Sequence, residues 1–127
     1  MAFTSTPEVV NSNNTWRLVS AGTTNSNLVN GSGTRLNGFL AINTSGSSKY
    51  LKFYDKATAP TVGTDTPKIT ILIPANTLSP VYLPFGDIRG VWFSNGLGIG
   101  ITGAVGDSDS TNISAGDIYL TLIYASS

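Results

Sequence analysis

The side chains of this chain that could do chemistry are carboxylates, since its 127 residues include no histidine and no cysteine. Without these two residue types the chain cannot build a Ser-His-Asp or Cys-His nucleophile, and it lacks the commonest ligands of transition metals. Disulfides and thiolate zinc sites are excluded for the same reason. We therefore expect a protein that is not an enzyme and that has no catalytic residue, cofactor or metal ion.

Three aspartates are candidates for the pair of carboxylates that glycoside hydrolysis requires across a cleft: Asp55, Asp65 and Asp87. The sequence does not show that these three carboxylates converge in the fold. Asp55 and Asp65 instead flank a loop, where aspartate commonly accepts hydrogen bonds from nearby backbone amides and fixes turns. We expect this structural role for both.

An acidic segment at residues 106–112 contains the Asp-x-Asp-x-Thr spacing of a calcium-binding loop. Asn112 stands where such a loop needs a glycine for its sharp turn, and no glutamate follows at the closing position. Gly31 and Gly33 form no phosphate-binding motif, because no Gly-Lys-Ser or Gly-Lys-Thr follows them. The acidic segment is therefore expected to be a solvated hairpin loop.

The elements that must position these residues are strands. Apolar residues alternate with a period of two, as in Ile69, Ile71 and Ile73, which share one face. Eight strands are predicted between clusters of Gly, Pro, Asn and Ser, at residues 15–21, 35–43, 49–55, 68–74, 79–84, 88–93, 97–103 and 117–125. The last of these is apolar on both faces, which predicts a strand that is central or covered on both sides. The fold class is all-β: a two-sheet antiparallel β-sandwich, jelly-roll-like, with about eight strands.

Residues 1–14 are predicted to form an extended N-terminal arm, followed by a single β-sandwich domain at residues 15–127. The arm contains Phe3, Val9 and Val10, too few apolar residues to build a core. We expect it to gain order by binding, so these three are candidate interface residues. The arm has neither the basic nor the apolar region of a secretory signal, and synthesis in a cytoplasm is expected.

Charge is sparse and balanced, with 11% of residues charged and seven basic against seven acidic side chains. No basic stripe is present to neutralise a row of phosphates, so nucleic-acid binding is not expected. No apolar run approaches the length of a transmembrane helix, so we expect no membrane partner. So few charges protect a monomer poorly against association, which predicts a homo-oligomer.

Residues 56–67, Lys-Ala-Thr-Ala-Pro-Thr-Val-Gly-Thr-Asp-Thr-Pro, are the most distinctive stretch of sequence. With the strand that starts at Tyr50, the alternating run to Ile73 and a late Ala-Gly-Asp at 115–117, they resemble a family of small bacteriophage virion structural proteins. The resemblance extends over about residues 36–124. It implies a small β-sandwich with no catalytic residue and the role of a virion component, of the capsid decoration or cement type.

A second group of candidate interface residues lies on strand 49–55. Tyr50, Lys52 and Tyr54 point away from Leu51 and Phe53, which are expected in the core. Tyrosines on a solvent-facing surface make a good contact patch, because each offers a large rigid ring with a polar tip. An ordinary cross-strand aromatic ladder is the alternative.

The run Leu97-Gly98-Ile99-Gly100-Ile101 places two glycines together on one face of its strand. Glycine in such positions lets another backbone or a large ring approach closely. Trp92, which is also a candidate interface residue, could supply that ring. Packing within the subunit is favoured here over contact between subunits.

The resemblance implies a bacteriophage capsid decoration (cement) protein, which we expect to self-associate as a homotrimer and to bind the major capsid protein. It would be made in the bacterial host cytoplasm and act on the outer capsid surface of the virion, where a three-fold junction suits a cyclic trimer. The alternative is a receptor- or carbohydrate-binding module of a phage tail or head fibre, with Trp92 or Tyr54 against a sugar ring. β-Sandwiches serve both purposes, so fold does not decide between them.

Overall fold

The computed structural model describes residues 13–84 and 90–126, with the backbone alone for residues 78–84. All helix or strand structure in these ranges is β-strand, which confirms the predicted all-β class. The nine strands are β1 (Asn14–Val19), β2 (Asn27–Asn30), β3 (Thr34–Asn43), β4 (Lys49–Asp55), β5 (Ile69–Ile73), β6 (Thr77–Pro84), β7 (Val91–Phe93), β8 (Leu97–Thr102) and β9 (Ile118–Ser126). Three predicted interface residues of the arm and one candidate carboxylate lie outside the described residues: Phe3, Val9, Val10 and Asp87.

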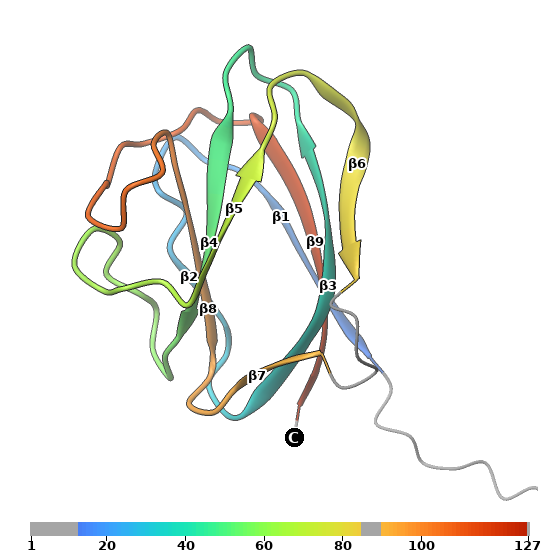
Figure 1. The fold of residues 1–127 in the computed structure, drawn as a ribbon, viewed down its shortest axis with the longest axis vertical. Coiled ribbons are helices and arrows are strands. Elements are labelled where there is room, and N and C mark those ends of the chain that lie inside the picture. Colours follow the sequence, from blue (N-terminus) through green and yellow to red (C-terminus); the bar gives the residue numbers. More distant parts are fainter. Residues whose placement is uncertain (1–12, 85–89, 127) are drawn as a thin grey trace, which may run out of the picture.

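Two sheets pack face to face, as Figure 1 shows. One has the strand order β1-β9-β3-β6, with β7 paired to β3, and the other has the order β2-β8-β4-β5. All of the pairings are antiparallel. Apart from β7, these two orders of four strands are those of a jelly roll, as predicted. The terminal strand β9 lies between β1 and β3, so its predicted central position is confirmed.

The strand predictions agree best where apolar alternation is strong. β4 has its predicted bounds, and β3, β5, β8 and β9 differ from prediction by one residue at one or both ends. β2 was not predicted, because Asn-Leu-Val-Asn is short and lies in a stretch rich in Asn, Ser and Thr. It forms by pairing with β8 through a register shift between Leu28 and Asn30.

The core fills the space between the two sheets. Phe39 of β3 and Phe53 of β4 meet from opposite sheets, with ring centroids 6.1 Å apart and planes tilted by 53°. Leu97, Ile99 and Ile101 of β8 are fully buried on its inner face, as their alternation with glycine predicted. Full burial of each such side chain contributes about 1.5–3 kcal/mol relative to exposure, so these residues hold the sheets together.

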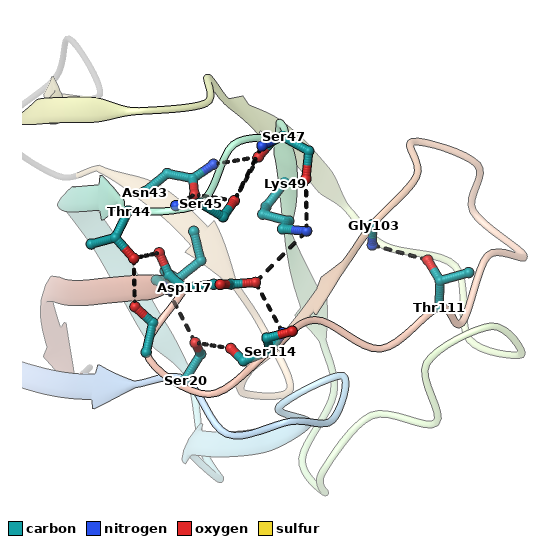
Figure 2. A network of polar contacts seen from close by, with 12 residues as sticks. Ser20, Asn43, Thr44, Ser45, Ser47, Lys49, Gly103, Thr111, Ser114 and Asp117 are labelled. Atoms are coloured by element: carbon teal, nitrogen blue, oxygen red, sulfur yellow. Dashed lines mark hydrogen bonds and ion pairs between the residues drawn. The ribbon is translucent and has the colours of Figure 1, made fainter.

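Hydrogen bonds order the turn between β3 and β4 at one end of the sandwich (Figure 2). Asn43, buried at the end of β3, donates to the carbonyl of Ser47 and accepts from the backbone N–H of Ser45, both at 2.9 Å. Lys49, at the start of β4, lies 3.7 Å from the carboxylate of Asp117, which directly precedes β9. The turn is therefore tied to strands of both sheets.

The alternation of Ile69, Ile71 and Ile73 predicts that Ile71, at the middle of their shared face, lies in the core between the two sheets, and the structure corrects this prediction. Ile73 is fully buried, whereas Ile71 is only partly buried against the core. The reason is the position of β5, which pairs with β4 alone and forms the edge of its sheet. An edge strand has neighbours on one side, so its middle residue keeps some contact with solvent.

We predict that Ile73→Ala lowers the free energy of unfolding by more than Ile71→Ala. Truncation of a buried isoleucine costs about 2–5 kcal/mol, with the larger values where a closed cavity remains. The loss for Ile73→Ala should fall in the upper part of that range, and the loss for Ile71→Ala near or below its lower end. Denaturant unfolding of the two variants measures the difference. An equal loss of stability would contradict the partly buried position of Ile71.

Candidate interaction surfaces

The outer face of the β2-β8-β4-β5 sheet is covered by loops of the same chain, which Figure 1 shows on that side of the sandwich. Pro60 and Val62, from the loop between β4 and β5, lie against Gly98 and Gly100 of β8. A Cβ built on Gly98 would lie 2.8 Å from Pro60 Cδ, and one on Gly100 would lie 2.5 Å from Val62 Cγ2. Because glycine has no side chain, the loop packs directly onto the sheet at these two positions. We call this surface the covered face.

The close approach predicted at these glycines is confirmed, but its partner was predicted wrongly. The ring beside Gly100 belongs to Tyr54, whose Cε1 would lie 3.4 Å from an added Cβ, and Trp92 is not among the nearest contacts of either glycine. Tyr54 and Gly98 face each other across the β4–β8 pairing, as do Lys52 and Gly100. The glycines thus make room for both the loop and the long side chains of β4.

The prediction that Lys52 and Tyr54 form an exposed contact patch is wrong. Both point outward from β4, as strand alternation requires, but Lys52 is 0% and Tyr54 1% exposed. Tyr50, the third member of the patch, is half-buried. Alternation predicts which face of a sheet a side chain occupies and does not predict what covers that face.

Lys52 ties β4 to the loop between β8 and β9. Its Nζ donates to the backbone carbonyl of Gly106 at 2.6 Å. Burial lowers the pKa of Lys52, and the nearby carboxylates of Asp109 and Asp107 partly offset that effect. Burial of an ammonium group with few partners lowers the stability of the fold. The hydrogen bond to Gly106 offsets part of that cost and holds the loop in place.

The side chain of Tyr54 fills space on the covered face. Its hydroxyl is buried and has no hydrogen-bond partner among the described residues. Burial, helped by the charges of Asp65 and Asp107, raises the pKa of Tyr54 to about 12. The phenol is therefore neutral over the physiological range, and its ring acts as a packing group.

The structural role predicted for Asp55 and Asp65 is confirmed. Asp65 accepts the Nζ of Lys56 at 2.6 Å and the backbone N–H of Thr61 at 2.7 Å, and these bonds hold its pKa below the ordinary value. Asp55 accepts the backbone N–H of Asn95 at 2.9 Å. Burial would raise the pKa of Asp55, but hydrogen bonds from the turn after β7 outweigh it and lower the pKa.

The outer face of the other sheet carries a different kind of surface. We call it the open face, because the loops that close the covered face lie on the opposite side of the sandwich (Figure 1). The pairing register and the burial pattern place these side chains on it: Arg17, Val19, Arg35, Leu40, Ile42, Trp92, Tyr119, Thr121 and Ile123. Val19, Trp92 and Tyr119 are each 39% exposed. An apolar sheet face with large exposed residues marks a contact surface.

A hollow of about 240 Å³ lies within the open face. It is lined by Arg17, Leu40, Ile42, Tyr119, Leu120 and Thr121. Arg17 is exposed and has no ion-pair partner among the described residues. The hollow therefore combines an apolar lining with one unpaired cation.

Trp92 lies at one end of the open face, beside β3. The guanidinium of Arg35 stacks on its ring, with Cζ 4.8 Å from the ring centroid. Such a cation–π contact is worth about 0.5–1 kcal/mol at an exposed site and holds the ring in one orientation. Trp92 therefore remains a candidate interface residue, on a different sheet from Tyr50.

Comparison with known proteins assigns no family to this chain. No protein-family model matches it, and no curated protein or solved structure shows significant similarity.

Within the part of the chain that the structure describes, no group of three or more His, Cys, Asp or Glu residues could hold a metal ion. The same residues include no helix that is long and apolar enough to cross a membrane. A functional proposal must therefore rest on the two faces.

We predict that Gly100→Ala destabilises the protein by about 1–3 kcal/mol, because the new methyl group would overlap Val62. Gly46→Ala is the matched control, since nothing lies within 4 Å of a Cβ there, and its effect should stay within about 0.5 kcal/mol. Adding Val62→Ala to Gly100→Ala should recover part of the loss. Thermal unfolding compares the variants, and a harmless Gly100→Ala would contradict the loop contact.

We predict that Tyr54→Phe does not destabilise the protein at neutral pH, since it removes a buried hydroxyl without a partner. At alkaline pH the variant should become the more stable of the two. The folded state holds the proton of Tyr54 up to about pH 12, whereas the unfolded chain releases it near pH 10, so wild-type stability falls between these values. Denaturant unfolding from pH 9 to 12 measures the difference, and parallel pH profiles would refute the burial of Tyr54.

Proposed function

We propose that this protein is a bacteriophage capsid decoration protein, which binds the outer surface of the shell and stabilises it without chemistry. The observation that carries the proposal is the asymmetry of the sandwich: its own loops close one face, and the other presents Val19, Trp92 and Tyr119 to solvent. The sequence resemblance to small virion structural proteins supports the same role. The jelly-roll topology is compatible with it, because that fold is common in viral capsid domains.

The physics of such a role requires only binding. A subunit that binds the assembled shell and not its separated parts stabilises the shell by mass action. A subunit that joins copies of itself while each copy contacts the shell gains further affinity from multivalency. A cyclic homotrimer placed at a three-fold junction of the major capsid protein meets both conditions.

The rival is a carbohydrate- or receptor-binding module of a fibre. The half-exposed ring of Trp92, with Arg35 against it, is the feature that favours this role, because sugars stack on aromatic rings beside polar groups. Tyr54, the other residue predicted to lie against a sugar ring, is buried and is not accessible to one. Copy number separates the two: a decoration protein is present in numbers of the same order as the major capsid protein, and a fibre module in far fewer.

The experiment uses particles of the phage that encodes this chain, prepared without it. We predict that these particles release their DNA at a lower temperature than complete ones, and that adding the purified protein restores the difference. Trp92→Lys, on the open face outside the hollow, should weaken binding to the particles about tenfold or more, as expected for a large aromatic contact. Leu72→Lys, at a 51% exposed position on the other sheet, is the matched control and should bind normally.

Two results would count against the proposal. One is unchanged release of DNA from particles that lack the protein, together with a copy number typical of a fibre. The other is normal restoration by Trp92→Lys, which would show that the open face is not the contact surface.

A further inference from the structure

We propose that the hollow of the open face binds the N-terminal arm, residues 1–12, of a second copy of this chain. The inference rests on the self-association in the proposed function and names the segment and the surface that meet in it. It can fail while the proposed function stands. It rests on the charge of the open face, on the composition of the arm and on the place where β1 begins.

The charged side chains that the described residues contribute to the open face are positive. The strands of its sheet contain Arg17 and Arg35 and no acidic residue. The described carboxylates all lie on β4 or in loops and turns: Asp55, Asp65, Asp107, Asp109 and Asp117. Arg35 is engaged with Trp92, whereas Arg17 lines the hollow without an ion-pair partner among the described residues. An occupant of the hollow should therefore be apolar and carry one carboxylate.

The arm has that chemistry. Its sequence contains one acidic residue, Glu8, followed directly by Val9 and Val10, with Phe3 five residues earlier. A hollow of about 240 Å³ lined by Leu40, Ile42 and Tyr119 is large enough for one or two aliphatic side chains and too small for a folded domain. Glu8 against Arg17, with the valines in the hollow, satisfies both requirements.

The place where the arm begins favours a second copy over the same molecule. Asn14 opens β1, which pairs with β9 alone and is therefore the edge strand of the open-face sheet. An arm that continues the line of β1 leads away from its own sheet, and reaching its own hollow needs a full reversal. Glu8, Val9 and Val10 lie four to six positions before Asn14, a span of about 13–20 Å when extended, which is enough to reach a sandwich that lies directly beside this one. Repeated around a closed ring, this head-to-tail contact joins the copies of a cyclic oligomer.

The absence of cysteine allows a direct test on the purified full-length chain. Val9→Cys and Thr121→Cys are prepared as separate variants, mixed in equal amounts and oxidised mildly. Thr121 lines the hollow, and Cys is close to Thr in size. We expect a covalent heterodimer of twice the 13.2 kDa chain mass, in excess over either homodimer. Val9→Cys mixed with Val105→Cys, at a 60% exposed loop position, is the control and should cross-link much less.

The charge pair is tested in the same assay. Arg17→Glu in the Thr121→Cys chain should lower the heterodimer yield about fivefold, a change worth about 1 kcal/mol, and Glu8→Arg in the Val9→Cys chain should restore it. Thermal unfolding checks that each variant is folded.

Equal cross-linking in the Val105→Cys control would overturn the proposal. A third variant carries both Val9→Cys and Thr121→Cys in one chain. A disulfide within this chain, without a heterodimer between the separate variants, would also overturn the proposal, since the arm would then bind its own sheet. If cross-linking fails while the purified protein still stabilises capsids, the arm contact is refuted and the proposed function stands. If cross-linking succeeds and the protein does not stabilise capsids, the arm contact stands and the proposed function is refuted.

Discussion

The rest of the structure depends on the contact between the glycines of β8 and the loop that follows β4. Gly98 and Gly100 have no side chains, so Pro60 and Val62 lie directly on the sheet, closer than any Cβ would allow. That contact turns a solvent-facing sheet surface into a second buried layer. It places Tyr54 and Lys52 under cover, and it brings Gly63 against Ser108 and Ser110 of the loop between β8 and β9.

One consequence is that the two sides of the sandwich differ in chemistry. The covered face contains a lysine whose charge is partly desolvated and a phenol with no described partner, both tolerated because the loops pack around them. The described loops leave the open face uncovered, and this face contains aliphatic and aromatic residues around two arginines. A sandwich built in this way offers a partner one side only, which suits a subunit that must sit on a shell in a single orientation.

The sequence predicts most of the fold and less of the candidate surface. Alternation in β4 and β8 is strong enough to assign their bounds and inner faces, and it also places Lys52 and Tyr54 correctly on the outer side. Their burial could not be read from alternation, because it depends on where a loop of no regular structure lies. The two glycines that face them across the β4–β8 pairing are the available signal: they indicate a close approach at this surface but not that Pro60 and Val62 make it. β2 was missed because its strand state depends on pairing with β8 more than on its own composition.

The central claim is that the open face, and not the covered face, meets the partner. Hydroxyl-radical footprinting of the free and the particle-bound protein measures it directly, because side chains in a contact lose reactivity when they are shielded from water. We predict that Val19 and Trp92, which lie on the open face outside the hollow, are protected in bound protein while Leu72 and Val105 react as in the free state. Protection of Leu72 and Val105 with unchanged reactivity of Val19 and Trp92 would contradict a contact through the open face.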